Sequence, residues 1–263
     1  MRKTLAARAV AVLRTADARH KADAARALSE DWVAGRIADT GRERPPERPA
    51  RPQRPELRLP RDMPRRGKAG SATGRIALLH ALAHIELNAV DLAADILVRF
   101  PDSDLPRAFH DDWVRVLAEE AKHFLLLDDR LRALGAAYGD LPAHDGLWQA
   151  ARETADDLLA RLAIVPLVLE ARGLDVTPAM IVNLRKAGDE DSAAVLDIVY
   201  RDEIGHVAIG HRWFAHFCER DPVETWRRIV RARFRGGLKP PFNDVARTEA
   251  GFGKAFYADI DAP

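Results

Sequence analysis

The sequence has a single cysteine, few aromatic residues and no long hydrophobic run, and each scarcity excludes a class of protein. Cys218 alone cannot form an intramolecular disulfide, so we expect a structural thiol in a reducing compartment. No segment approaches the roughly 20 consecutive apolar residues of a membrane span. Near the start, Arg8, Arg14 and Asp17 interrupt an alanine-rich stretch where a signal peptide would be apolar, so we expect a cytoplasmic protein without a membrane partner.

What the sequence does contain favours helices in one large domain with extensions. The 263 residues are 47% hydrophobic, enough for a substantial core, while aromatic residues make up only 6%. Alanine, leucine and arginine dominate, and these residues favour helix over sheet. We predict an all-α fold with four regions: N-terminal peripheral helices over 1–40, a Pro/Arg-rich extended arm over 41–71, a four-helix bundle over 72–220, and a C-terminal basic helix and tail over 221–263 packed on the bundle.

Positive charge is concentrated in two places, although the net charge is only +1. Residues 42–68 contain ten basic and four acidic side chains with prolines among them, a composition that predicts an extended segment rather than a helix. A second cluster has basic residues and no acid: Arg227, Arg228, Arg231, Arg233, Arg235 and Lys239. Both clusters suit an anionic or nucleic-acid partner; the alternative is a solvated linker and surface.

Four long helices are predicted, and each carries one glutamate in the middle of the face that its leucines and valines would bury. Their ranges and glutamates are Thr73–Arg99 with Glu86, Pro106–Leu134 with Glu120, Leu147–Leu174 with Glu170, and Asp191–Cys218 with Glu203. Pro166 removes a backbone donor, so we expect a kink or bulge one turn before Glu170. A separate short segment is expected over Pro178–Ala187, and a basic helix over Pro222–Phe234.

Two of these glutamates are followed three positions later by a histidine, which places both side chains on one helix face. The pairs are Glu120-Ala-Lys-His123 and Glu203-Ile-Gly-His206. The composition would produce about half of one such pair by chance, so two pairs centred on buried faces indicate a function. An ionised carboxylate in an apolar face is costly unless it is paired or binds a metal, and no Lys or Arg lies on these faces.

The sequence therefore predicts a dinuclear metal site. Its ligands are Glu86, Glu120, His123, Glu170, Glu203 and His206. Four carboxylates cancel the charge of two divalent cations, and each histidine supplies one neutral nitrogen ligand. Oxygen-rich ligation with two imidazoles favours two iron ions, with manganese as the alternative, over a structural zinc. In the alternative interpretation no metal binds, and the four glutamates are protonated or locally paired core acids.

An acid precedes each of the two Glu-x-x-His pairs, namely Glu119 and Asp202. A metal-bound histidine usually donates its second ring N–H to a carboxylate, which fixes the tautomer. We expect a crossed arrangement in which Asp202 orients His123 and Glu119 orients His206. In the alternative interpretation neither acid orients a histidine, and both lie at the surface.

Three further polar residues lie on the predicted helices. Tyr200 is one turn before Glu203, where it could tune the metals or donate an electron; the alternative is a core tyrosine with a satisfied hydroxyl. His80 and His84 are four residues apart, but His84 does not share the helix face of Glu86, so we expect structural histidines rather than ligands. A phosphate-binding glycine loop, a nucleophilic triad and zinc-finger spacing are all missing.

Four segments carry a resemblance to a known family: His84-Ile-Glu-Leu, Tyr138-Gly-Asp-Leu-Pro-Ala-His144, Leu169-Glu-Ala-Arg-Gly-Leu-Asp-Val-Thr-Pro178 and Asp202-Glu-Ile-Gly-His-Val207. Over roughly 72–243 the chain resembles the bacterial ferritin-like family known only as domain of unknown function 455, within the ferritin-like di-iron carboxylate superfamily. The resemblance implies the bundle and the dinuclear site but no substrate. A more distant likeness is to a di-iron hydroxylase acting on a hypermodified tRNA adenosine.

The expected function is that of a non-haem di-iron oxidoreductase, an O₂-dependent hydroxylase or oxidase of a small-molecule or nucleic-acid substrate. Such an enzyme requires an external electron donor. The alternatives are ferroxidase or iron-storage activity, a dimanganese catalase-like activity, and a binding module in which the metals are only structural. Because about 70 residues precede the predicted bundle, we expect a monomer or small homo-oligomer rather than a closed storage shell.

Overall fold

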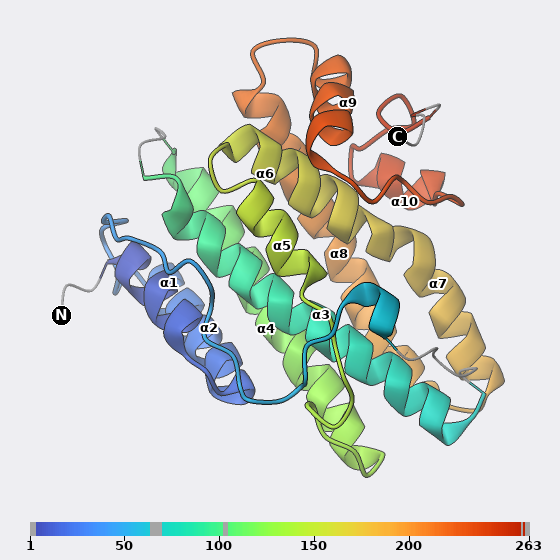
Figure 1. The fold of residues 1–263 in the computed structure, drawn as a ribbon. Coiled ribbons are helices and arrows are strands. Elements are labelled where there is room, and N and C mark those ends of the chain that lie inside the picture. Colours follow the sequence, from blue (N-terminus) through green and yellow to red (C-terminus); the bar gives the residue numbers. More distant parts are fainter. Residues whose placement is uncertain (1–3, 64–69, 102–104, 259, 261–263) are drawn as a thin grey trace.

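The computed structural model describes residues 4–63, 70–101, 105–258 and 260, and the long regular elements in these ranges are all helical (Figure 1). In chain order they are α1 Leu5–Arg14, α2 Ala18–Val33, the short 3-10 helix η1 Pro60–Asp62, α3 Ala72–Arg99, α4 Arg107–Ala133, α5 Gly146–Glu153, α6 Leu158–Ile164, the π-helical turn η2 Val165–Glu170, α7 Ala171–Lys186, α8 Glu190–Phe217, α9 Pro222–Arg233 and α10 Asp244–Glu249. The prediction of an all-α chain is confirmed for these ranges. None of the described helices has the length and apolar character that crossing a membrane requires.

Helices α3 and α8 begin where a side chain can satisfy one of their first backbone N–H groups. Ser71 precedes α3, and its Oγ accepts a hydrogen bond from the backbone N–H of Gly74 at 3.1 Å. Asp189 precedes α8 and accepts from the backbone N–H of Ser192 at 3.0 Å. Because capping residues and apolar periodicity are both local signals, the bounds expected for α3, α4, α8 and α9 agree with the observed ones to within one residue.

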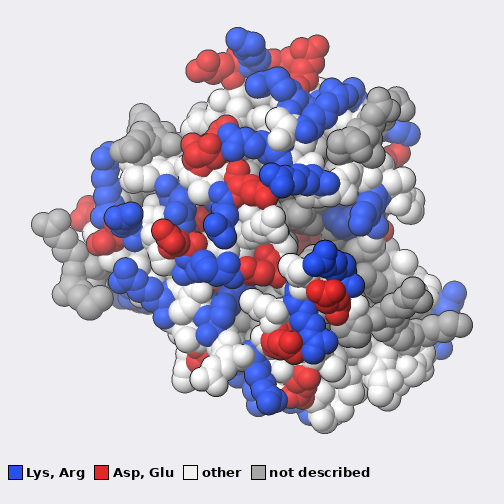
Figure 2. Space-filling view, in the orientation of Figure 1, with Lys and Arg blue, Asp and Glu red and all other residues white. Residues whose placement is uncertain are grey.

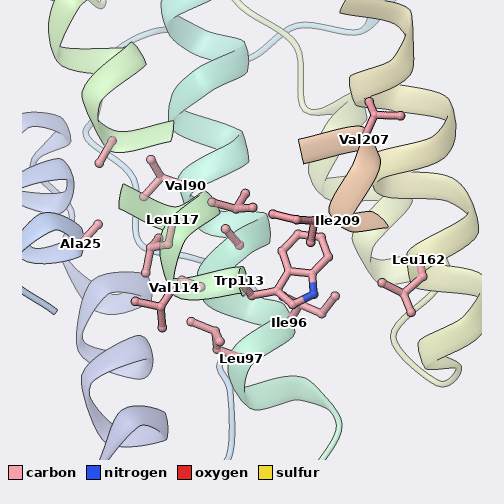
Figure 3. Packing of buried hydrophobic residues seen from close by; sticks show 14 of the residues in the cluster. Ala25, Val90, Ile96, Leu97, Trp113, Val114, Leu117, Leu162, Val207 and Ile209 are labelled. Carbon is pink, nitrogen blue, oxygen red and sulfur yellow. The ribbon is translucent and has the colours of Figure 1, made fainter. Parts of the chain in front are cut away.

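Helix α3 packs along α4, α7 packs along α8, and α4 also contacts α8 (Figure 1). One buried hydrophobic cluster joins these helices to α1, α2, α6 and α9. Figure 3 shows part of it, with Ile96 of α3, Trp113 of α4 and Ile209 of α8. The carboxylates and histidines of the candidate site therefore lie on helices that a large apolar core holds in place.

The N-terminal helices α1 and α2 lie against α3 and α4, and the chain then returns along the molecule without a helix through residues 37–59. The backbone N–H of Ala50 bonds to the carbonyl of Leu13, and Arg58 N–H bonds to the carbonyl of Ala143. Arg51 pairs with the buried Asp91 of α3 at 2.7 Å. Of the arm expected over 41–71, residues 64–69 lie outside the described ranges.

The third predicted helix is wrong in two respects. Instead of one helix over 147–174, α5 ends at Glu153, and a new start follows at Asp157, whose side chain caps α6 through Ala160 N–H at 3.1 Å. The helical path then runs past Leu174 to Lys186, so the separate segment expected from Pro178 does not exist. Pro178 has no backbone N–H to donate to the carbonyl of Leu174. Asn243 Nδ2 donates to that carbonyl instead, at 3.1 Å, and this bond allows Pro178 to lie inside α7.

The bulge expected at Pro166 is confirmed, since the π-helical turn η2 contains it. Helix α8 accommodates this turn with a glycine. A Cβ atom added at Gly210 would lie 2.3 Å from Cβ of Pro166, closer than two carbon atoms can approach. The contact of Gly210 with Pro166 therefore sets how closely the helix carrying Glu170 approaches the helix carrying Glu203.

Candidate metal centre

The structure brings the six predicted ligand residues into two groups that share Glu203. Glu86, Glu120, His123 and Glu203 form the first group, and Glu170, Glu203 and His206 form the second. Within each group, one candidate ligand atom per residue lies within 4.8 Å of the others. Glu170 is half-buried, and the other five residues are buried.

Glu120 lies between the two histidines and faces each with a different oxygen. Its Oε2 is 3.6 Å from Nδ1 of His123, and its Oε1 is 3.0 Å from Nδ1 of His206. On the outer sides, Glu86 Oε2 is 3.3 Å from Nδ1 of His123, and Glu203 Oε1 is 3.6 Å from Nδ1 of His206. Both imidazoles therefore direct Nδ1 into the carboxylate cluster.

The outer nitrogens of both histidines contact the acids that the sequence places before the Glu-x-x-His pairs. Nε2 of His123 lies 2.9 Å from Asp202 Oδ2, and Nε2 of His206 lies 2.8 Å from Glu119 Oε2. This is the crossed arrangement expected from the spacing. A carboxylate only accepts hydrogen bonds, so each Nε2 carries the proton and each Nδ1 can present a lone pair to a metal.

Several donor atoms of the cluster are buried without a hydrogen-bond partner among the described residues. They are both carboxylate oxygens of Glu120, Oε2 of Glu170, Oε2 of Glu203 and Nδ1 of His206. Buried polar atoms are normally paired, because an unpaired one loses its hydration without compensation. The unpaired atoms converge on one small volume and are all potential metal ligands, so the donor set fits bound cations.

Two other buried acids on α3 provide a comparison within the same helix. Asp91 is paired with Lys21 at 2.5 Å and with Arg51, while Asp95 is paired with Arg161 at 2.6 Å and with Arg99. Each of these structural acids therefore has two cationic side chains.

Among the described residues, no lysine or arginine pairs with a carboxylate of the cluster. In the described part of the chain, Glu86, Glu120 and Glu203 form ion pairs only with the two histidines, and Glu170 forms none. The cations that these carboxylates require are therefore not supplied by lysine or arginine.

Burial and crowding shift the pKa values of the cluster acids in the direction of proton uptake. Burial raises the pKa of Glu86 to about 8. Burial and the neighbouring carboxylate of Glu203 raise the pKa of Glu170, and burial and Glu120 raise that of Glu203. Glu120 differs, because although burial opposes it, the adjacent imidazoles of His206 and His123 lower its pKa.

The same buried carboxylates shift the pKa values of the two histidines. Burial disfavours an imidazolium, but the neighbouring carboxylates of Asp202, Glu120 and Glu86 raise the pKa of His123 well above its usual value. Coulombic attraction from Glu120 and Glu203 has the same effect on the pKa of His206. Without a bound metal, protons therefore occupy part of the cluster. Binding of divalent cations would displace them.

A cavity of about 240 Å³ opens beside the cluster, between α3, α5, η2, α7 and α8. All four cluster glutamates line it, and most of its other walls are leucine, valine and similar apolar side chains. The sequence alone does not reveal this cavity. Val176, Thr177 and Met180 form part of its wall on α7. All three lie beyond Leu174, where the third predicted helix ended, and Met180 falls in the segment that was expected to be separate.

The hydroxyl of Tyr200 accepts a hydrogen bond from Asn243 Nδ2 at 3.0 Å, which links α8 to the C-terminal segment. This satisfied hydroxyl matches the alternative interpretation of Tyr200, and its role in tuning the metals stays a prediction. His80 and His84 are structural as expected: His80 accepts from Gly139 N–H at 2.9 Å, and His84 bonds to Tyr138 and to the carbonyl of His144.

Comparison with known proteins gives a family but no activity. A family model described as "Protein of unknown function (DUF455)" matches residues 14–258. An uncharacterised protein of Haemophilus influenzae is 41% identical over 209 residues, which cover 76% of this chain and 72% of that protein. No solved structure gives a significant match.

Proposed function

The chain belongs to the DUF455 family, whose description assigns no activity, and we propose from its own site that it is a non-haem di-iron oxidoreductase that uses O₂ to hydroxylate or oxidise an organic substrate. Glu86, Glu120, Glu170 and Glu203 would bind or bridge the irons, and His123 and His206 would be terminal ligands. When bound, two ferrous ions would supply the electrons that activate O₂. An external electron donor would then restore the reduced state.

The observation that carries this proposal is the set of unpaired buried donors around Glu120. Its two oxygens face the inner nitrogens of two histidines, so one carboxylate can serve both metal positions. The four glutamates carry four negative charges when ionised, which two divalent cations balance. This charge and ligand set is typical of carboxylate-bridged centres in ferritin-like four-helix bundles, and we include that fold type for 72–220 in the proposal.

The protein itself would contribute ligand geometry and a dry environment. Asp202 and Glu119 hold the two imidazoles with Nδ1 directed inward. The apolar walls around the four glutamates exclude water from the place where an organic molecule would react. This cavity favours oxidation of a substrate over the alternative of ferroxidase or iron storage, which needs a route for ions rather than an apolar space.

Anaerobic loading with ferrous iron, followed by exposure to O₂ and recorded by absorption and Mössbauer spectroscopy, tests the proposal. We expect two irons per chain and an oxidation that requires O₂. Two manganese ions in the purified protein together with rapid peroxide disproportionation would favour a catalase-like protein instead. Absence of any O₂-dependent spectral change in iron-loaded protein would leave only a structural role for the metals.

Variants of the shared ligands give the first prediction. Glu120→Ala and Glu203→Ala should each abolish binding of at least one metal, because each residue faces donors of both subsites. Metal content per chain is measured by elemental analysis after dialysis. Asp95→Asn is a matched control, since this acid is buried on α3 but paired with Arg161 and Arg99, and it should keep two metals if it folds. Unchanged stoichiometry in both glutamate variants would refute the assignment.

A further inference from the structure

The cavity beside the cluster is apolar along most of its wall. Eleven of its eighteen lining residues carry hydrocarbon or thioether side chains, and four of the remaining ones are the cluster glutamates. Its volume of about 240 Å³ lies below the 300–1,000 Å³ of most drug-sized ligand sites. The cavity therefore suits a small molecule whose body is largely hydrocarbon.

The exposure of the lining residues distinguishes an inner end from a rim. Val165, Leu196 and Glu120 are almost completely buried. By contrast, Ile85 is 37% exposed, and the side chain of Arg172 is 39% exposed. A ligand would thus enter past Ile85 and Arg172 and extend toward Glu120.

Arg172 is the one cationic side chain among these lining residues. Its Nη1 donates to the carbonyl of Lys239 at 2.6 Å, and the Asp175 carboxylate lies 3.5 Å away. Asp175, however, already accepts two hydrogen bonds from Arg247, at 2.7 and 2.8 Å. Asp175 is thus shared by two guanidinium groups and only partly balances the positive charge of Arg172.

The C-terminal segment lies beside this rim. The chain between α9 and α10 runs beside α7 (Figure 1), and the bond from Arg172 fixes it there at Lys239. On the face shown in Figure 2, acidic side chains are interspersed among the Lys and Arg side chains. The distinctive feature of the rim is therefore a cation at the mouth of an apolar cavity, rather than a broad basic surface.

The two ends of the cavity would orient an acidic ligand in one direction. In the metal-free protein, an anionic group placed at the inner end would meet the cluster carboxylates, whereas at the rim it could accept charge-assisted hydrogen bonds from Arg172. A hydrocarbon body gains free energy by leaving water for the apolar walls. We propose that the cavity binds a small apolar acid, with its carboxylate or phosphate at Arg172 and its hydrocarbon end toward the cluster. Its role as the oxidised substrate rests on the proposed di-iron function, although its binding does not.

Calorimetric titration with octanoate and with octan-1-ol, which share one chain and differ in the acid, tests the proposal on metal-free protein and on ferrous protein without O₂. We expect saturable 1:1 binding of octanoate, and about tenfold weaker binding of octanol. Octyl phosphate should bind in the same way as octanoate. Comparison of these two anions shows which acid group the rim prefers.

Arg172→Gln should weaken octanoate binding about tenfold and leave octanol binding unchanged, and Arg172→Lys should restore part of the preference. Arg228→Gln is the matched control, because Arg228 is an exposed arginine of α9 that does not line the cavity, and it should bind octanoate normally. A purely structural role of the bond to Lys239 would affect both ligands equally. Ile85→Glu, which places an acid at the rim, should also discriminate against octanoate.

Equal binding of octanoate and octanol, or no binding of either, would overturn the proposal. Saturable binding of RNA oligonucleotides without binding of octanoate would overturn it in favour of a nucleic-acid substrate. Iron content is measured on the same samples. Two irons without octanoate binding would refute this inference alone, and octanoate binding without iron would refute the di-iron function alone.

Discussion

Each histidine of the cluster is held between acids on both sides, and this arrangement follows from the residue order in α4 and α8. In α4, Glu120 and His123 share the face turned toward the cluster. Glu119, one position before Glu120, instead contacts His206 of α8. The sequence could predict these roles because helical spacing alone fixes which side chains share a face. It could not identify Arg172, whose importance depends on the Asp175–Arg247 pair and on a cavity formed by distant segments.

At this scale we predict that removal of an outer acid weakens metal binding without removing a ligand. Asp202→Ala deprives His123 of the acceptor that fixes its tautomer, and loss of such a partner costs about 10- to 100-fold in metal affinity. Competition with a chromophoric chelator measures that affinity. Asp197→Ala on the same helix, whose carboxylate pairs with Arg185 away from the cluster, should bind metal normally. Equal affinities of the two variants would contradict the orienting role.

The helical segments between residues 146 and 186 show where local signals are insufficient. Periodicity located the positions that face inward and Pro166 predicted the bulge, but Pro178 was wrongly interpreted as the start of a separate segment. Helix α7 continues through it because Asn243, about 70 residues later, donates to the unserved carbonyl of Leu174. A hydrogen bond from a residue so far along the chain leaves no sequence pattern near Pro178, so the sequence could not predict it.

The close approach of η2 to α8 gives a prediction for a whole element. Gly210→Ala places a methyl group against the ring of Pro166, and we expect a loss of about 1–3 kcal/mol in the free energy of unfolding, measured with urea. Gly205→Ala is the matched control in the same helix, because its new Cβ would meet only Arg115 Nη2 at 3.9 Å. That variant should gain up to about 1 kcal/mol through helix propensity. A neutral or stabilising Gly210→Ala would show that η2 can move away from α8.

On the scale of the whole molecule, a polar centre lies inside an otherwise apolar helical core. The buried pairs of Asp91 and Asp95 contain their own cations, whereas the four cluster glutamates have only two histidines. All-α character and the bounds of most helices followed from composition and periodicity. The cavity and the path of the N-terminal segment did not, since both depend on how separate elements meet.

Metal binding should consequently stabilise the folded chain. A ligand that binds only the native state at 100 times its dissociation constant contributes about 2.7 kcal/mol per site. We expect ferrous iron under anaerobic conditions to raise the melting temperature, and a chelator to reverse the effect. Glu120→Gln should lose this increase, because it replaces the carboxylate that faces both histidines with a neutral amide of the same size. Identical melting curves with and without metal would contradict the prediction.

The crossed bonds between α4 and α8 also connect the two proposed metal positions mechanically. A rotation of α4 that withdraws His123 would at the same time break the bond of Glu119 to His206, and Glu120 faces both imidazoles. Neither position can loosen alone. In the proposed centre, the first ion to arrive should therefore preorganise the second position, so that loading is cooperative and partly filled protein is scarce.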